Sequence, residues 1–151
     1  MVAPLAGFFA LEGGDEDIKQ LHYCGHRNAI KPRLSVVENL AFWAAVNGPT
    51  GLDPDAALDE VGLAGLGGLD AGYLSAGQAR RLALARLLVS HRPLWLLDEP
   101  TASLDIEGHG LVTRLIDRHL DRGGMAIAAT HDPITLPDLA RMETLVLGGR
   151  Q

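Results

Sequence analysis

An apolar run that ends in two acids is the part of this sequence best suited to chemistry. Residues 94–97 (Leu-Trp-Leu-Leu) are typical of a strand buried on both faces, and Asp98 and Glu99 follow them directly. One carboxylate at such a strand end can hold Mg²⁺ through its water shell, and a second can orient or deprotonate an attacking water. A strand that merely ends in a solvated acidic turn would show the same pattern, so the run alone does not decide.

A helix start is the second candidate. Ser75 and, three residues later, Gln78 fit a capping box, and an apolar helix follows them. The hydroxyl of Ser75, together with Gly77, would also let backbone N–H groups approach a phosphate closely. A plain cap and a phosphate site need the same geometry, so both interpretations stay open.

Two more residues lie where expected elements end or begin. His131 follows the apolar residues 125–130 and could contact a terminal phosphate, although a loop histidine is more often simply hydrogen-bonded. Asp105 could belong to the same site, or it could be only the N-cap of the helix that follows it.

The elements that must position these residues alternate in type. In the first half we expect a strand at 8–11 before a glycine turn, a strand at 21–24, and helices at 35–43 and 54–61, so that 35–73 forms a small helical subdomain. In the second half we expect helices at 78–90, 106–121 and 133–139 and strands at 94–97, 125–130 and 142–147. Strands separated by helices predict an α/β fold with a mostly parallel sheet, in which ligands bind beyond the carboxyl ends of the strands.

Composition limits the class of protein. The 151 residues are 47% apolar and 21% charged, as in one ordinary globular domain. A net charge of −6 offers no basic stripe to neutralise phosphates, so we expect no nucleic-acid partner. Cys24 is the only cysteine, which excludes an internal disulfide and favours a reducing compartment. No apolar run is long enough to span a bilayer, so a membrane role would need a partner.

In chain order the candidate segments resemble four motifs of the ATP-binding cassette (ABC) ATPases. Residues 74–78 resemble the signature, 94–99 the Walker B strand with its catalytic glutamate, 103–105 the D-loop, and His131 the switch histidine. Order and spacing together are far more specific than any single motif. The resemblance implies that residues 1–151 are an incomplete ABC ATPase domain, with 74–151 as its signature-to-switch region.

The same resemblance implies cofactors, a partner and roles. ATP and Mg²⁺ would be the cofactors, and a second ATPase subunit would complete the site in a dimer. In that site Glu99 would polarise the water, Asp98 would serve Mg²⁺ and His131 would contact the γ-phosphate. The residues expected to contact the nucleotide bound by the partner, or to lie beside it, are Ser75, Gly77, Gln78 and Asp105.

A narrower resemblance rests on residues 23–43 and on the form Leu-Ser-Ala-Gly-Gln-x-Arg-Arg at 74–81. Gly25-His26 stands where other ABC ATPases have the glutamine of their Q-loop, so His26 would lie at the nucleotide. These features are similar to the ATP-binding subunit of the bacterial haem exporter of cytochrome c maturation (the CcmA family). The resemblance implies a peripheral subunit on the cytoplasmic face of the inner membrane, docked on membrane-spanning transporter subunits. Hydrolysis would drive transport or release of haem or of a haem-loaded chaperone.

His22, Cys24 and His26 alternate and would share one face of a strand. A haem or metal site there is disfavoured, because histidines on a strand face are usually structural and no further ligand cluster is nearby.

The phosphate-binding Walker A loop, G-x-x-x-x-G-K-[ST], is absent from the sequence, whose only lysines, Lys19 and Lys31, do not follow a glycine. We therefore expect an N-terminal truncation or a misplaced start, no ATPase activity of the chain alone, and lost neighbours for the strand at 94–97. Two alternatives stay open, namely a non-hydrolytic regulatory module and the ATP-binding subunit of another ABC transporter. An ATPase head from DNA repair is disfavoured by the acidic charge and by the absence of coiled-coil heptads.

Overall fold

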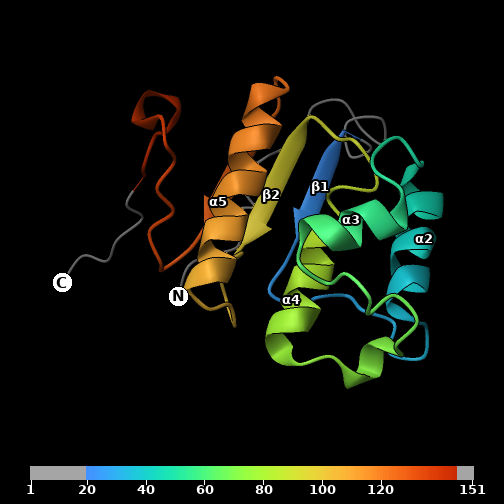
Figure 1. Cartoon of the computed structure of the whole chain (residues 1–151). Coiled ribbons are helices and arrows are strands. Elements are labelled where there is room, and N and C mark those ends of the chain that lie inside the picture. The colour runs from blue at the N-terminus through green and yellow to red at the C-terminus, as the bar shows by residue number, and fades with distance from the viewer. Residues whose placement is uncertain (1–19, 146–151) are drawn as a thin grey trace.

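A single parallel sheet organises the computed structural model, which describes residues 20–145. The strand order is β1–β2–β3, and both pairs of neighbours are parallel. The carboxyl ends of the strands therefore meet at one edge of the sheet, as the arrowheads of β1 and β2 show (Figure 1). This arrangement, with helices beside the sheet, confirms the predicted α/β fold, while the strand and turn expected at 8–15 lie outside the described residues. The strands are β1 (Leu21–Cys24), β2 (Leu94–Asp98) and β3 (Met125–Ala129).

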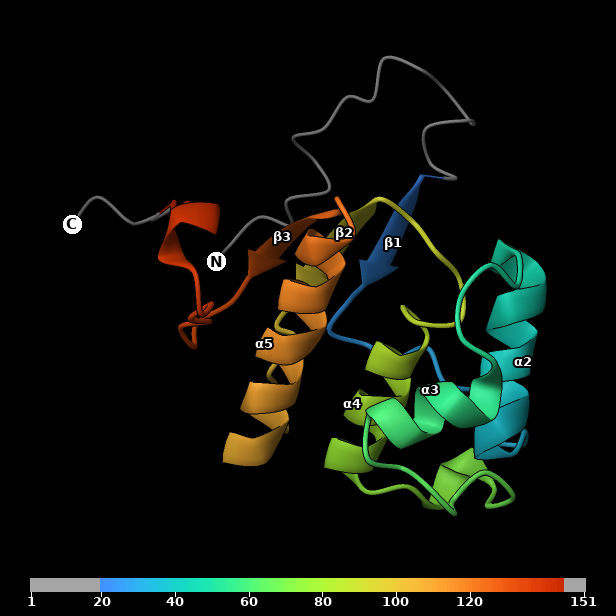
Figure 2. The ribbon, with the colours of Figure 1, turned by 45° about the horizontal axis from the view of Figure 1, so that its top comes forward.

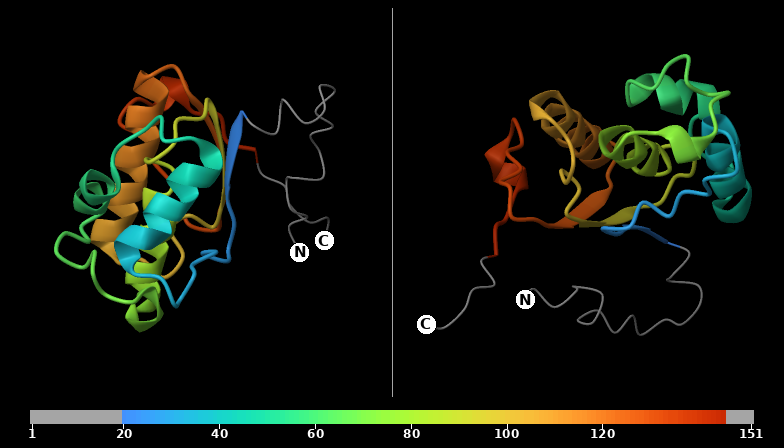
Figure 3. Two further views of the ribbon diagram at one scale, coloured as in Figure 1. Left: turned by 90° about the vertical axis from the view of Figure 1, so that its right-hand side faces the viewer. Right: turned by 90° about the horizontal axis from the view of Figure 1, so that it is seen from below.

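β2 is the central strand and keeps a hydrogen-bonded neighbour on each side. The expectation that the strand at 94–97 would lose its neighbouring strands is therefore wrong on both of its sides. The described helices lie over one face of the sheet (Figure 3), where Trp95 and Leu97 are buried. No described element covers the opposite face, on which Tyr23 is 49% and Met125 61% exposed. Among the described residues, the exposed apolar side chains of the sheet therefore lie on the face opposite the helices.

Four helices begin at side-chain caps that the sequence already shows. Each cap accepts a hydrogen bond from the backbone N–H three residues later, which satisfies one of the free donors at a helix start. The caps are Ser35, Asp53, Ser75 and Asp105. The helices that follow them are α2 (Val36–Asn47), α3 (Pro54–Glu60), α4 (Ala76–Ala85) and α5 (Ile106–Asp121).

The region between β1 and α4 contains α2, α3 and a 3₁₀ turn, η2 (Ala71–Tyr73), which lie beside α4 (Figure 2). α2 extends past the helix expected at 35–43 and ends at Gly48, whose φ of +91° suits a residue without Cβ. One hydrophobic core joins this region to the sheet, because Leu40 and Leu58 belong to the same buried cluster as Leu97.

α4 differs from the helix expected at 78–90, because it begins two residues earlier and already ends at Ala85. After that end, the C=O of Leu88 accepts a hydrogen bond from the N–H of Leu52 at 2.8 Å. The approach is so close that a Cβ on Gly51 would lie 2.0 Å from the oxygen of Leu88. The N–H groups of Leu87 and Leu88 form 3₁₀-type bonds to the C=O groups of Leu84 and Ala85, so the chain leaves the α-helical pattern there and then packs against the loop at 50–52.

The C-terminal predictions are wrong within the described residues. Residues 133–138 form no helix, and a 3₁₀ turn, η3 (Leu139–Arg141), follows instead. Pro137 explains the difference, because it has no N–H to donate and disfavours helical backbone at the residue before it. No strand forms at 142–145, and the remaining residues of that expected strand lie outside the described part of the chain. Within residues 20–145, no helix combines the length and the apolar character needed to cross a membrane.

Candidate functional site

The end of β2 carries the two acids into a sharp change of backbone direction. The N–H of Glu99 still donates to the C=O of Ala129 at 2.8 Å, so the residue remains tied to β3. Its φ of +48° nevertheless lies in the left-handed region, which residues with a Cβ rarely adopt. The side chains of Asp98 and Glu99 are 33% and 29% exposed, so both carboxylates are partly sheltered and still reachable from solvent.

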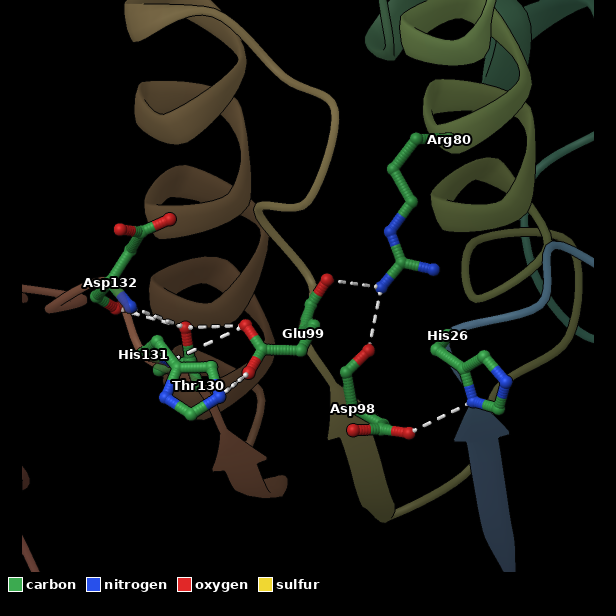
Figure 4. Close-up of polar contacts among 7 residues, drawn as sticks. All are labelled: His26, Arg80, Asp98, Glu99, Thr130, His131 and Asp132. Atoms are coloured by element: carbon green, nitrogen blue, oxygen red, sulfur yellow. Dashed lines mark hydrogen bonds and ion pairs between the residues drawn. The ribbon is translucent and has the colours of Figure 1, made fainter. Parts of the chain in front are cut away.

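Glu99 is surrounded by the residues that follow β3 (Figure 4). Nε2 of His131 lies 3.3 Å from Oε1 of Glu99, while the backbone N–H of His131 donates to Oε2 at 3.3 Å. Oγ1 of Thr130 lies 3.4 Å from the same Oε2 and shares its one O–H proton between this oxygen and the C=O of Asp132 at 3.0 Å. These donors hold the carboxylate in one orientation, with the exposed imidazole of His131 beside it.

Asp98 faces a different histidine. Nδ1 of His26, two residues after β1, lies 3.4 Å from Oδ2 of Asp98 (Figure 4). The four residues Asp98, Glu99, His131 and His26 are thus brought together at the carboxyl edge of the sheet, as the rule for parallel sheets predicts.

His22 and Cys24 do not share a face with His26. Both are buried beneath the helices, and Nε2 of His22 lies 2.7 Å from the C=O of Ser90. Burial lowers the pKa of His22 and raises the pKa of the Cys24 thiol, so both side chains favour their neutral forms. In the described stretch 20–145, no group of three or more His, Cys, Asp or Glu side chains is arranged to hold a metal ion.

The other candidate residues from the sequence line a hollow of about 340 Å³ at the start of α4. Its lining residues are Ser75, Gly77, Gln78, Arg81, Ser103, Leu104 and Asp105. Both bonds of the predicted capping box are present, with the N–H of Gln78 donating to Oγ of Ser75 at 3.2 Å and the N–H of Ser75 donating to Oε1 of Gln78 at 2.9 Å. Asp105 caps α5 by accepting from the N–H of Gly108 at 2.8 Å.

Gly77 allows the loop before α5 to lie against the start of α4. A Cβ at this position would stand 3.1 Å from the C=O of Ser103, which is tighter than an ordinary contact. Ser103 itself has a φ of +64°, so the loop takes a sharp left-handed turn there. Arg81 joins the two elements from the other side, with Nη2 3.6 Å from Oδ1 of Asp105. The hollow is therefore built by both segments together.

Arg80 is the residue near the site that sequence reasoning missed. It lies on α4 next to Arg81, yet it is only 2% exposed and its guanidinium reaches the backbone at the end of β2 (Figure 4). The sequence shows it as the first arginine of the form Leu-Ser-Ala-Gly-Gln-x-Arg-Arg at 74–81, one helical turn before Leu84 and therefore on the same helix face as that apolar residue.

Comparisons with known proteins agree with this geometry. A profile of the ABC transporter family matches residues 13–102. A protein named cytochrome c biogenesis ATP-binding export protein CcmA, from Rhodopseudomonas palustris (strain BisB5), is 53% identical over 137 residues, covering 89% of this chain and 68% of the relative. A protein of the same name from Bradyrhizobium diazoefficiens is 52% identical over 134 residues, covering 87% of this chain and 67% of the relative.

Solved structures show the same fold. A dimeric ATP-binding cassette in a post-hydrolysis state, bound to ADP and Pi, superposes with a TM-score of 0.68 at 23% identity. A second dimeric bacterial ABC transporter cassette gives a TM-score of 0.66 at 23% identity. Each match covers 79% of this chain and 57% of the solved chain. The chain therefore spans little more than half the length of those cassettes.

Proposed function

This chain belongs to the ABC transporter family and to its branch of cytochrome c biogenesis ATP-binding export proteins, and we propose that it contributes the hydrolytic edge and the signature of a haem-exporting ATPase. In this proposal ATP hydrolysis drives haem export or the release of a haem-loaded chaperone. The observation that carries the proposal is the meeting of Asp98 and Glu99 with histidines from the ends of β1 and β3 at one sheet edge.

The donor set at this edge is compatible with Mg²⁺ and ATP. The partly exposed carboxylate of Asp98 is the hard oxygen ligand that Mg²⁺ prefers, and Mg²⁺ is usually held by one or two carboxylates, waters and phosphates. Asp98 would hold the ion through its water shell, and His26 would lie at the same nucleotide. When bound, Mg²⁺ supplies charge neutralisation for the phosphates.

Glu99 and His131 would act directly on the reaction. The N–H of His131 and the hydroxyl of Thr130 hold one oxygen of Glu99, so the carboxylate is oriented before a water arrives. Glu99 would accept a hydrogen bond from the attacking water and take up its proton. The exposed ring of His131 would contact the terminal phosphate and respond to its loss.

In a dimer, the hollow at the start of α4 would contribute to the nucleotide site of the second subunit. The helix N-terminus attracts negative charge, and Gly77 allows close backbone approach. Ser75, Gly77 and Gln78 would therefore meet the nucleotide of a second ATPase subunit, with Asp105 beside them. The dimeric solved cassettes support this arrangement. Membrane-spanning subunits would place the assembly on the cytoplasmic face of the bacterial inner membrane.

A completed subunit tests the proposal. We define it as this chain joined at its N-terminus to a segment that carries the phosphate loop G-x-x-x-x-G-K-[ST]. Glu99→Gln should lower ATP turnover by at least about 100-fold while ATP affinity stays within about threefold, because the amide keeps the shape but accepts no proton. Steady-state phosphate release and binding of a fluorescent nucleotide measure the two quantities.

The matched control is Glu107→Gln, an exposed glutamate in the first turn of α5, which should leave turnover unchanged. Equal turnover by the Glu99→Gln variant and the unmodified completed subunit would overturn the proposed role. A completed subunit that binds ATP without hydrolysing it would also contradict the proposal.

A further inference from the structure

Arg80 buries a positive charge between α4 and the end of β2. Its side chain is 2% exposed, and its guanidinium donates five hydrogen bonds. The acceptors are the C=O groups of Gly25 (2.7 Å), Asp98 (2.9 Å), Glu99 (2.7 Å) and Pro100 (3.2 Å) and Oδ1 of Asn28 (3.2 Å). All five acceptors are neutral, and in the described part of the chain no carboxylate forms an ion pair with Arg80.

A buried charge without a counter-ion is costly to the fold. An apolar side chain of similar volume would fill the space at lower cost, so packing alone does not account for Arg80. What an apolar side chain cannot supply is a planar set of donors that several carbonyl groups can share. The arrangement of those carbonyl groups therefore indicates what Arg80 does.

Three consecutive carbonyl groups, those of residues 98–100, converge on this one guanidinium. Figure 4 shows the contacts with Asp98 and Glu99. The middle residue, Glu99, has a φ of +48°, a conformation that costs energy for any residue with a Cβ. Such a conformation persists only when the surroundings hold it. Nη2 of Arg80 donates to the carbonyl oxygens of both Asp98 and Glu99. These are the carbonyl groups on either side of the N–Cα bond of Glu99, whose rotation φ describes.

The left-handed backbone determines where the carboxylate of Glu99 points. In extended backbone, successive side chains alternate between the two faces of the sheet. The turn at Glu99 instead directs the carboxylate along the sheet edge, toward Thr130 and His131. A group that stabilises this backbone therefore orients the proposed general base without touching the substrate.

We propose that Arg80 is a positioning residue for ATP hydrolysis, which holds Glu99 in its left-handed conformation and links the start of α4 to the carboxylate. This inference rests on the proposed role of Glu99. Arg80 lies two residues after Gln78 on α4. Its side chain therefore connects the start of this helix, which is proposed to face the partner's nucleotide, to the backbone of Glu99. The same guanidinium reaches Gly25, next to His26, and thereby ties the end of β1 to the same point.

Arg80→Gln in the completed subunit provides the main test. The amide offers fewer donors and no charge, so kcat should fall by at least about 30-fold while KM for ATP changes by less than about threefold. Adding Arg80→Gln to Glu99→Gln should cause almost no further loss, because both changes act on the same carboxylate. A merely structural role would lower the amount of folded protein without producing this split between kcat and KM.

Arg86→Gln is the matched control, because Arg86 follows the same helix and also donates to a backbone carbonyl, that of Asn28, at 3.0 Å. It stacks on Trp43 and does not reach residues 98–100. Its loss should lower Tm while kcat per folded molecule is unchanged.

A second measurement uses the 151-residue chain itself and the milder Arg80→Lys variant. The N–H of Ala102 donates to the C=O of Glu99 at 3.1 Å, so its hydrogen exchange reports on the held turn. Exchange there should accelerate by at least about tenfold, while the N–H of Gly108, bonded to Asp105, keeps its rate. Unchanged exchange at Ala102 would overturn the inference.

The failures of the two proposals are distinguishable. Normal kcat in Arg80→Gln together with an inactive Glu99→Gln variant would reject the positioning role and leave the proposed function standing. Normal turnover in Glu99→Gln would reject the proposed function itself.

Discussion

The two acids that end β2 are adjacent in the sequence but differ in what surrounds them. Glu99 receives donors from Thr130 and from the backbone of His131, which orient its carboxylate. Asp98 instead faces the exposed imidazole of His26 at 3.4 Å. A carboxylate that is already oriented, such as that of Glu99, is suited to act as a general base. A carboxylate with one side open to solvent, such as that of Asp98, is suited to hold a metal ion through water molecules. This difference underlies the separate roles that we propose.

Two buried histidines make the stability of the chain depend on pH. Burial lowers the pKa of His22 and of His119, and it outweighs the hydrogen bonds from their ring nitrogens to backbone carbonyls. In the folded chain both rings therefore take up a proton at a lower pH than in the unfolded chain, where they titrate near pH 6.5. Their contribution is complete above that pH and is lost as the pH falls toward the lowered folded-state values. The free energy of unfolding should accordingly fall between pH 7.5 and pH 5.5.

Urea unfolding at the two pH values measures this dependence. His119→Gln should remove part of it, although the variant also loses the stacking of the ring on Trp95 at 3.9 Å and so starts from lower stability. His109→Gln, on the same helix, is the control and should keep the full dependence. An identical pH slope in the His119→Gln variant and the unmodified chain would contradict the prediction.

At the scale of elements, α2 and α4 begin in the same way. Both start with a capping box, in which the Oγ of Ser35 or of Ser75 accepts a hydrogen bond at 3.2 Å from the backbone N–H three residues later. The side-chain oxygen of that later residue accepts a hydrogen bond from the N–H of the serine. The hydrogen bond within the α2 box also lowers the pKa of Glu38. The local physics of the two starts is the same, so only their surroundings can separate a cap from a nucleotide contact.

Alanine at the two caps separates these roles. Ser35→Ala and Ser75→Ala should each lower the free energy of unfolding by about 1 kcal/mol, because each leaves a helix donor unsatisfied. Only Ser75→Ala should also reduce ATP turnover of the completed subunit, by about tenfold or more. Urea unfolding and phosphate release measure the two effects. Equal turnover in both variants would show that Ser75 is a cap and nothing more.

At the scale of the whole molecule, the described helices cover one face of the sheet and leave the other open (Figure 3). The carboxyl edge of the sheet and the hollow at the start of α4 are separate places on this molecule, joined through Arg80. In the proposed dimer each would belong to a different nucleotide site, so that one chain takes part in both.

Nucleotide binding tests this description of the molecule. The sequence contains no G-x-x-x-x-G-K-[ST] loop to cradle phosphates, so the 151-residue chain alone should show no binding of MgATP at concentrations up to about 1 mM. The completed subunit should bind it in the micromolar range. Isothermal titration calorimetry measures both, and micromolar binding by the chain alone would contradict the expectation.

Local signals predicted the elements well wherever the cause is local. α5 spans the residues expected, because its cap Asp105 and its terminal Gly123 both lie within the segment itself. The end of α4 at Ala85 was not predictable, because residues 86–90 contain no glycine or proline, and the loop at 50–52 that binds the carbonyl groups of Leu88 and Val89 is distant in the sequence. The expected helix at 133–139 does not form, because Pro137 has no N–H to donate and disfavours helical backbone at the residue before it.

From residue 20 to the end of β3, the sequence by itself indicated the order of the elements, the helix caps and the two acids at the end of an apolar strand, and its motifs indicated the family. These features depend on residues a few positions apart. Only the tertiary structure decided that His26 and His131 stand beside Asp98 and Glu99, that Glu99 is left-handed, and that Arg80 holds it. Those relations depend on the register of parallel strands and on burial, which bring together residues that are tens of positions apart in the chain.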